Sequence, residues 1–306
     1  MEDLILQKVP SIIYGIIFSM QTLKEAVEAA WEKKIALGHF NLSDSNQFNA
    51  VLAAAAAASM PVLVGVSEGE RKFFGVRNVA ALVRAAREAG IQVYLNADHT
   101  YSLDACKEVI DAGFDSVIFD GSHLPMEENI ATTRAVVEYA RSKSNGGHEI
   151  LVEGEIGRIG TSSKLLDAPP EDMDKNLTDP EEAARFVRES GVDMLAPAVG
   201  TMHGRLVGGG EPKIDLARIE AIRSAVGIPL VLHGGSGSSD TDLATVGKLG
   251  CSIVHINTDI RVAYRKGIEA SLAADAKEIA PYKFLAEGVA GVEQMTEKYI
   301  RLFAGV

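Results

Sequence analysis

Short apolar runs alternate with longer amphipathic segments along most of the chain. The runs are rich in Val, Ile and Leu and are bounded by Gly, Asp or Pro, which is typical of strands buried on both faces of a parallel sheet. They predict strands at residues 36–41, 62–66, 93–97, 116–119, 150–155, 194–199, 230–233 and 252–256. The segments between them predict helices at residues 45–59, 76–89, 103–112, 127–142, 180–190, 216–225, 241–249 and 258–272.

Residues at the ends of the predicted helices support this pattern. Ser102, Asp179 and Asp215 each stand where an N-cap is expected, and Pro180 takes a first helical position. Glycine ends helices at "EAG", "DAG" and "ESG", as a left-handed terminator does. Eight strand–helix units without a linker predict one α/β domain, a single (β/α)8 TIM barrel over residues 20–306. An open doubly wound sheet is the competing architecture, but no G-x-G-x-x-G follows the first predicted strand.

Residues 1–19 stand apart from the barrel pattern. They are largely apolar, but polar residues and a proline interrupt them, so the run is too short and too broken for a membrane span. It also lacks the basic start and the cleavage site of a signal peptide. We interpret it as an N-terminal extension, either an arm that packs on the barrel or on a partner subunit, or a mis-assigned start. The segment that follows, residues 21–34, predicts an amphipathic helix.

Composition and charge narrow the function classes. The 306 residues are 47% hydrophobic and 24% charged, which is ordinary for a globular protein. A net charge of −12 argues against nucleic acid or an anionic membrane as a partner, so an anionic substrate must be held by local donors. The chain has only 2 cysteines, and they lie far apart, which argues against a disulfide scaffold and predicts a reducing, cytoplasmic location. A metal would therefore be bound by His, Asp or Glu.

Three of the seven histidines stand just past the ends of predicted strands: His99 in "NADHT", His203 in "GTMHG" and His233 in "LHGGSG". They follow the third, sixth and seventh strands, and the carboxyl ends of barrel strands converge on one mouth. Three neutral imidazoles with positions left open form a good catalytic zinc shell. The alternative is that each is a structural hydrogen-bonding residue. Three others are interpreted as structural or surface residues: His39, His123 and His148.

Asp98 precedes His99 directly and is the candidate catalytic residue. Neighbouring residues at a strand end point in different directions, so Asp98 can face a substrate as a proton donor and acceptor while His99 binds metal. A helix cap is the alternative role for Asp98, although Ser102 already serves the next helix.

Glycine-rich turns after the seventh and eighth predicted strands offer a phosphate site. In a barrel these two loops commonly cradle a phosphate with backbone N–H groups and a helix N-terminus. The candidate contacts are Gly234, Gly235, Ser236, Asn257 and Thr258. Two longer loops, residues 160–176 and 200–212, follow the fifth and sixth strands, and we expect the first of them to be a functional lid.

Several motifs together resemble one family. "GHFN", "VSEGE", "DAGFDSVIFDGSHLPMEENI", "VEGEIGRIG", "GTMHG", "GEPKID", "HGGSG" and "INTDIR" occur in the order found in class II fructose-bisphosphate and tagatose-bisphosphate aldolases. The resemblance covers about residues 20–272. It implies a cytoplasmic, homodimeric or homotetrameric lyase of carbohydrate metabolism and glycolysis. Such an enzyme reversibly cleaves fructose 1,6-bisphosphate, tagatose 1,6-bisphosphate or a related ketose 1-phosphate to dihydroxyacetone phosphate and an aldehyde, through a metal-stabilised enediolate.

The resemblance also implies residue roles. His99, His203 and His233 match the ligands of one catalytic Zn²⁺, and Asp98 matches the residue that moves a proton at the C4 hydroxyl. A monovalent cation near the phosphate is also implied. Glu153 and Glu155 match carboxylates near the metal, where one either orients a ligand or binds metal at a second position, and a buried structural pair is the alternative. The positions that match phosphate and ketose contacts are Asn41, Ser67, Gly204, Gly234, Gly235, Ser236, Asn257 and Thr258.

Three departures from the family pattern bear on the substrate. His255 stands where the family usually has Asn, which replaces an amide with a titratable ring close to the reacting carbons. The lid lacks the family's acidic motif, and its nearby acids are Glu171, Asp172 and Asp174. Val289 occupies the position of the arginine that grips a distal phosphate, and the candidates to replace that arginine are Arg205, Lys164 and Lys283.

These departures leave alternatives open. A divergent family member acting on a ketose 1-phosphate without a second phosphate is one, and a catalytically inactive regulatory homologue is another. A zinc hydrolase on the same fold is a rival from a different enzyme class, since three histidines and an acid can equally activate water. Its usual H-x-H on the first strand is lacking at residues 38–40.

Overall fold

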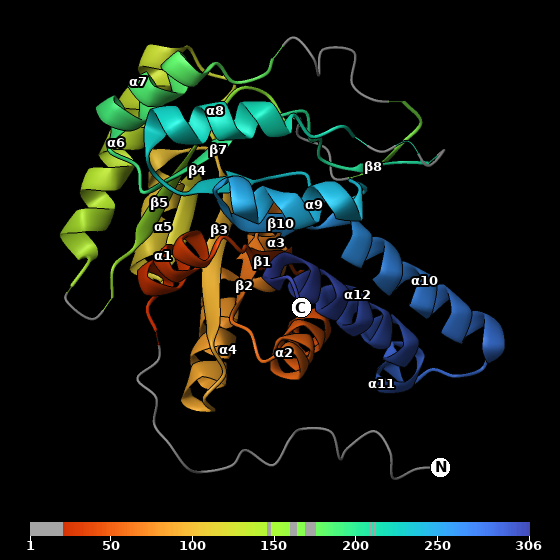
Figure 1. Ribbon diagram of the computed structural model, residues 1–306. Helices are drawn as coiled ribbons and strands as arrows, with labels where there is room; N and C mark the ends of the chain where they lie inside the picture. Colours follow the sequence, from red (N-terminus) through yellow and green to blue (C-terminus); the bar gives the residue numbers. More distant parts are fainter. Residues whose placement is uncertain (1–20, 146–147, 160–163, 169–175, 208–209, 211) are drawn as a thin grey trace.

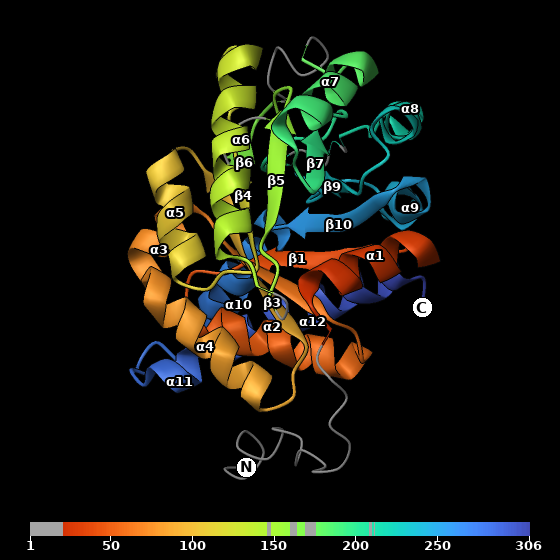
Figure 2. The same ribbon diagram turned by 90° about the vertical axis from the view of Figure 1, so that its left-hand side faces the viewer.

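Eight parallel strands close into a barrel, as the sequence predicts. The computed structural model describes residues 21–145, 148–159, 164–168, 176–207, 210 and 212–306. The ring order is β1-β10-β9-β7-β5-β4-β3-β2. The barrel strands are β1 (Leu37–Asn41), β2 (Val62–Val66), β3 (Val93–Thr100), β4 (Ser116–Phe119), β5 (Leu151–Ile156), β7 (Met194–Pro197), β9 (Leu230–Leu232) and β10 (Cys251–Ile256). Figures 1 and 2 show the helices on the outside of this ring.

The predicted helices are confirmed, with ends that differ by a few residues. They are α1 (Leu23–Lys33), α2 (Ser45–Ala58), α4 (Val76–Glu88), α5 (Leu103–Asp111), α6 (Met126–Lys143), α7 (Pro180–Ser190), α8 (Leu216–Val226), α9 (Asp240–Val246) and α10 (Thr258–Ala274). The side chains of Ser102, Asp179 and Asp215 accept hydrogen bonds from backbone N–H groups in the first turns of α5, α7 and α8. The helices therefore begin where the capping residues place them.

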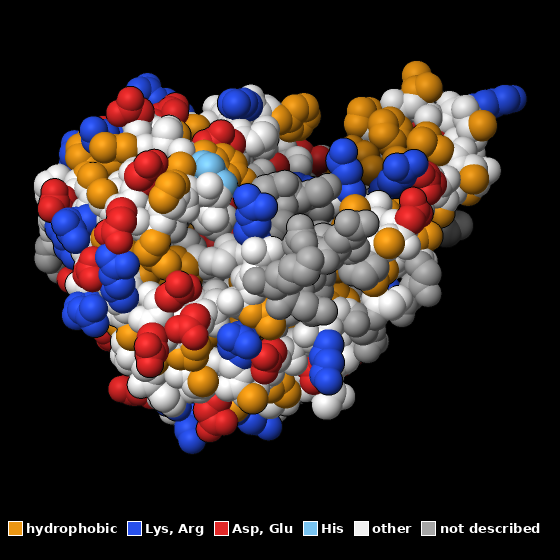
Figure 3. Space-filling view, turned by 90° about the horizontal axis from the view of Figure 1, so that it is seen from above, with side chains coloured by type: hydrophobic (Ala, Val, Ile, Leu, Met, Phe, Trp, Pro, Cys, Tyr) orange, Lys and Arg blue, Asp and Glu red, His pale blue; other side chains and the backbone are white. Residues whose placement is uncertain are grey.

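Three helices were not predicted: α3 (Glu68–Phe74), α11 (Pro281–Phe284) and α12 (Ala286–Ala304). The long α12 packs against α2 and α10. Its amino-terminal part lies beside α10 and α11 in an arm that projects from the barrel (Figure 1), and Figure 3 shows this projection in a space-filling view. The arm carries exposed apolar side chains at Leu272, Ile279 and Tyr282.

The two long loops contact each other. Their short strands β6 (Leu165–Leu166) and β8 (Arg205–Leu206) pair in parallel as a separate two-stranded sheet. The loop after β5 is thus joined to the loop after β7 at the same end of the barrel. Part of the predicted lid, including Glu171, Asp172 and Asp174, lies outside the described residues.

Side chains that point into the barrel change from apolar to polar along the strands. At the amino-terminal ends, inward residues such as Leu37, Tyr94 and Leu151 pack with one face of α1, which closes the bottom of the barrel. Two and four residues further along, the same faces carry polar side chains, for example Asn96 and then Asp98 on β3. Strand alternation therefore delivers the polar groups to the carboxyl end.

The N-terminal region is described from residue 21. The capping box of Thr22 and Glu25 starts α1, which confirms the predicted amphipathic helix. The extension at residues 1–19 lies outside the described residues and stays a prediction. Within the described part of the chain, no helix combines the length and the apolarity needed to cross a membrane.

Gly65 leaves room for a buried ring inside the barrel. A Cβ at this position would overlap the His39 imidazole, which is held by Asn96 through Nε2 and Oδ1 at 3.1 Å. We expect Gly65→Ala to lower the free energy of unfolding by about 2 kcal/mol, since the core cannot expand around the added methyl group. Urea denaturation measures this.

Gly69, in α3, is the matched control, because a Cβ there meets no atom within 4 Å. Gly69→Ala should leave stability unchanged or slightly higher. Equal midpoints for Gly65→Ala and the unmodified protein would contradict the steric explanation.

Candidate active site

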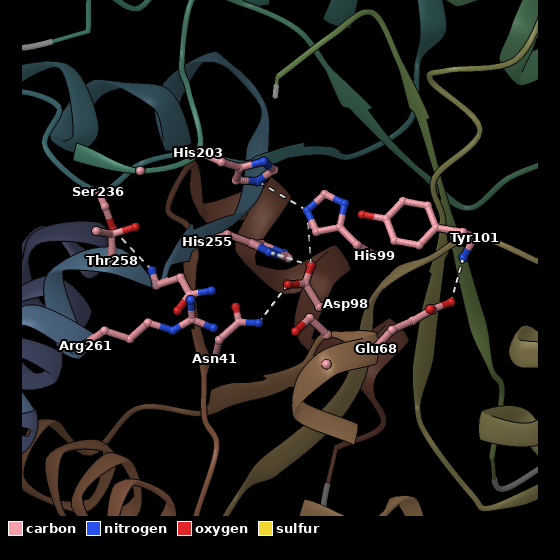
Figure 4. A pocket seen from close by; sticks show the side chains of 15 residues that line it. Asn41, Glu68, Asp98, His99, Tyr101, His203, Ser236, His255, Thr258 and Arg261 are labelled. Atoms are coloured by element: carbon pink, nitrogen blue, oxygen red, sulfur yellow. Dashed lines mark hydrogen bonds and ion pairs between the residues drawn. The ribbon is translucent and has the colours of Figure 1, made fainter. Parts of the chain in front are cut away.

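A cavity of about 260 Å³ opens at the carboxyl ends of the barrel strands (Figure 4). Eleven of the residues singled out from the sequence line it: Asn41, Ser67, Asp98, His99, His203, Gly204, Gly234, Ser236, His255, Asn257 and Thr258. Gly235, Glu153 and Glu155 are buried behind this lining. Side chains from distant parts of the sequence are thus gathered at one mouth.

The three candidate metal ligands lie together at the cavity, where His99 and His203 line it and the fully buried His233 lies behind the lining. Nε2 of His99 lies 3.2 Å from Nε2 of His203. The ring of His99 is 4.7 Å from that of His203 and 4.9 Å from that of His233, measured between centroids. One nitrogen from each of the three rings lies within 4.8 Å of the others. This spacing fits three ligands of one ion.

His99 reaches the cavity through an irregular strand end. The prediction placed Asp98 and His99 beyond the third strand, whereas β3 continues to Thr100, and this corrects the predicted boundary. Strict alternation would send the two side chains to opposite faces. The pairing of β3 with β4 shifts at this point, and His99 adopts a φ of 36°, in the left-handed region. The irregularity turns His99 toward the same mouth as Asp98, and such strain is common at functional sites.

Buried carboxylates hold the outer nitrogens of two of these rings. Glu153 Oε1 lies 2.8 Å from His233 Nε2, and Asp120 Oδ2 lies 3.0 Å from His99 Nδ1. Glu155 Oε2 is 3.6 Å from the same His99 nitrogen. These contacts leave Nδ1 of His233 and Nε2 of His99 turned toward the shared space, and the buried His233 Nδ1 has no hydrogen-bond partner among the described residues. Such carboxylate–histidine pairs fix the tautomer and the orientation of a ligand.

Asp120 was not singled out from the sequence. It follows β4, which ends at Phe119, in the sequence "FDG". Asp120 is therefore a polar residue at a strand end, like the histidines that were singled out. That position was the signal that could have identified it, because every barrel strand delivers its carboxyl end to the same mouth.

Burial and neighbouring charges shift the pKa values of several groups in this cluster. Burial alone raises the pKa of Asp98, but the charge on His99 and the hydrogen bond from His255 outweigh burial and hold this pKa well below its ordinary value. Burial lowers the pKa of His99, whereas Asp98, Asp120 and Glu155 raise it, to about 10. Burial and then the neighbouring Asp120 raise the pKa of Glu155 to about 8. The cluster of carboxylates thus favours a positive charge among the imidazoles.

Asp98 is held from the side opposite His99. Asn41 Nδ2 donates to Asp98 Oδ2 at 2.7 Å, and Asp98 Oδ1 lies 3.5 Å from His255 Nδ1. The ring of His255 stacks on that of His39, with centroids 3.5 Å apart, and lies tilted against that of His233, with centroids 3.9 Å apart. His255 therefore packs under the histidine cluster and faces Asp98, while its Nε2 has no partner among the described residues.

The predicted phosphate turn closes the other side of the cavity. Gly234 has a φ of 65°, and a Cβ there would contact the backbone of Met202, so a larger residue does not fit. Backbone N–H groups of Asn257 and Asp259, at the start of α10, each donate to Ser236 Oγ at 3.2 Å. Accepting two such bonds leaves the Ser236 hydroxyl proton for an anion at the helix N-terminus.

None of the suggested replacements for the distal-phosphate arginine lines the described cavity. Arg205 pairs with Asp259 at 2.7 Å, and Lys283 pairs with Glu278 at 3.2 Å. The cavity has four lining residues that sequence reasoning missed: Glu68, Gly69, Tyr101 and Arg261. Glu68 and Gly69 lie within "VSEGE" and Arg261 lies within "INTDIR", but the motifs alone assigned these residues no role.

Comparisons with known proteins agree with this geometry. Residues 21–306 match the family model described as fructose-bisphosphate aldolase class-II. The chain is 37% identical over 274 residues to the fructose-bisphosphate aldolase of Geobacillus stearothermophilus, spanning 88% of this chain and 92% of that protein. It is 38% identical over 272 residues to the 6-phospho-5-dehydro-2-deoxy-D-gluconate aldolase of Shouchella clausii (strain KSM-K16), spanning 88% and 89%.

Among solved structures, the YdjI aldolase from Escherichia coli K12 superposes with a TM-score of 0.75 at 28% identity, covering 90% of this chain and 94% of that chain. With a closed barrel and a histidine cluster at its mouth, the chain belongs to the class II fructose-bisphosphate aldolase family and is an aldolase, a lyase that acts on a carbon–carbon bond.

Proposed function

We propose that the chain is a zinc-dependent aldolase that reversibly cleaves a phosphorylated ketose to dihydroxyacetone phosphate and an aldehyde. The observation that carries this proposal is the convergence of three imidazoles, from His99, His203 and His233, on a cavity with an anion cradle at one side. Fructose 1,6-bisphosphate, tagatose 1,6-bisphosphate or a related ketose 1-phosphate is the substrate class. A cytoplasmic location, a homodimer or homotetramer and a monovalent cation near the phosphate stay predictions.

The donor set fits a divalent cation. Three nitrogen ligands with an open position are the usual catalytic arrangement for zinc, and the chain has no cysteine near this site. The facing Nε2 atoms of His99 and His203, 3.2 Å apart, require a proton or a cation between them. Zn²⁺ held by these three histidines would supply Lewis-acid polarisation of the ketose carbonyl. Glu153 and Asp120 keep the rings of His233 and His99 in place for it.

Asp98 moves the proton at C4. In cleavage its carboxylate accepts the proton of the C4 hydroxyl, while the electron pair of the C3–C4 bond passes to C3 and its adjoining carbonyl. In condensation it returns that proton to the oxygen of the aldehyde. Asn41 holds Oδ2 at 2.7 Å, which fixes the carboxylate at the cavity wall for this transfer.

The phosphate of the ketose binds at the start of α10. Ser236, Asn257 and Thr258 line this side of the cavity, and Gly204 and Gly234 let the backbone approach. Local N–H and O–H donors there compensate for the net negative charge of the protein.

Metal removal tests the central claim. Treatment with a chelator should abolish ketose phosphate cleavage, and added Zn²⁺ should restore it. His99→Ala should remove bound zinc, measured by elemental analysis, and lower kcat/KM by at least about a hundredfold. His123, which is exposed, provides the control, and His123→Ala should keep its zinc. Full activity in the metal-stripped protein would overturn the proposal.

Glu153 provides a test that does not depend on turnover. Glu153→Gln removes the charge that orients His233 and should weaken zinc binding by about 10–100-fold in a competition titration with a chelator. Glu149→Gln alters an exposed carboxylate paired with Lys24 and should leave zinc affinity unchanged. Equal affinities for both variants would assign Glu153 a purely structural role.

Ser236 tests the phosphate end. Ser236→Ala should raise the KM for dihydroxyacetone phosphate about tenfold in the condensation direction, because a hydroxyl donor to the anion is lost. Ser239 caps α9 with the same kind of side chain, and Ser239→Ala should leave this KM unchanged. An unaltered KM in the Ser236 variant would place the phosphate elsewhere.

A further inference from the structure

A buried carboxylate organises the side of the cavity away from the phosphate turn. Glu70, which is 6% exposed, accepts hydrogen bonds at Oε2 from Ser67 N at 2.7 Å, Ser67 Oγ at 2.9 Å and Asn41 Nδ2 at 2.9 Å. Its other oxygen, Oε1, pairs with the guanidinium of Arg261 in the first turn of α10. One carboxylate thus connects three residues that line the cavity.

The hydrogen bonds of Asn41 and Ser67 determine which of their polar atoms remain free to bind a substrate. Both N–H groups of the Asn41 amide are used, one by Glu70 and one by Asp98, and carboxylates can only accept. The amide oxygen is therefore what Asn41 offers to the cavity, and Figure 4 shows the amide nitrogen turned toward Asp98. The single hydroxyl proton of Ser67 is committed to Glu70, which leaves its lone pairs. Both residues act as acceptors.

The charges on this side have the same sign as a phosphate. Among the described residues that line the cavity, Arg261 is the one Lys or Arg, and Glu70 neutralises it. Glu68 and Asp98 add two further carboxylates to the lining. A phosphate dianion carries acceptors only, so it would meet acceptors and negative charge here. A hydroxyl group can donate to both acceptors.

This side receives the aldehyde half of the substrate. Asn41 touches Asp98, which acts at the C4 hydroxyl under the proposed function, and Figure 4 shows Ser236, where the ketose phosphate is proposed to bind, apart from Asn41 and Glu68. The carbons beyond C4 therefore extend toward Asn41, Ser67 and Arg261.

We infer that Glu70 and Arg261 are positioning residues that set the aldehyde specificity, so that the enzyme takes an uncharged, hydroxylated aldehyde rather than a phosphorylated one. Glu70 acts through Asn41 and Ser67, and its ion pair withholds the charge of Arg261. The inference rests on the proposed function, because it takes the aldehyde to be a substrate.

The test is condensation of dihydroxyacetone phosphate with D-glyceraldehyde or with D-glyceraldehyde 3-phosphate. The measured quantity is the ratio of the two kcat/KM values, in which losses common to both aldehydes cancel. The unmodified enzyme should favour D-glyceraldehyde by about tenfold or more. A preference for the phosphorylated aldehyde would overturn the inference.

Two variants should move this ratio in opposite directions. Glu70→Gln frees the charge of Arg261 and should shift the ratio toward the phosphorylated aldehyde by about tenfold. Arg261→Gln leaves Glu70 unpaired and should shift it further toward D-glyceraldehyde. A merely structural role would not produce opposite shifts, and an unchanged ratio in both variants would overturn the inference.

Arg265→Gln is the matched control, because Arg265 lies on the same helix in an exposed pair with Glu269 and should leave the ratio unchanged. A second experiment separates the inference from the proposed function. It follows hydrogen exchange in D₂O by NMR, without any aldehyde, at the hydroxymethyl carbon of dihydroxyacetone phosphate, which becomes C3 of the ketose. Exchange together with the wrong aldehyde preference would refute the inference alone. No exchange by the zinc-loaded enzyme would refute the proposed function, and the inference with it.

Discussion

The closed ring of parallel strands is the constraint on which the rest depends. Inward side chains recur every second residue, and a ring leaves them no free face, so those at one level must contact one another. On β1 this order is Leu37, His39, Asn41, which passes from the apolar bottom layer to the cavity. Apolar packing against α1 stabilises one end, and polar groups that could not be buried elsewhere collect at the other.

Burial makes the polar end rigid as well as reactive. Asp120 and Glu153 are almost fully buried, so each must find a partner, and the imidazoles of His99 and His233 are those partners. The same contacts that satisfy the carboxylates aim the remaining ring nitrogens at one point. Local strain at His99 is tolerated because the surrounding barrel over-determines its position.

The cavity has two ends of different chemistry. Ser236 Oγ accepts the N–H groups of Asn257 and Asp259, so its hydroxyl proton remains as a donor, whereas around Glu70 the hydrogen-bond directions are reversed and acceptors face inward. Arg261 lies on the same helix as the donors but is turned to Glu70. Discrimination between substrates can therefore arise from the direction of a few buried hydrogen bonds rather than from cavity size.

The sequence by itself determined the barrel strands, most of the helices and the residues gathered near the strand ends, because alternation, capping residues and glycine turns are local properties. The pattern predicted all eight strands and the convergence of His99, His203 and His233, since the carboxyl ends of barrel strands share one mouth. The pairings of Asp120 with His99 and of Glu70 with Arg261 were decided only by the tertiary structure. The latter partners are 191 residues apart, and no local pattern records which buried charge a distant side chain must neutralise.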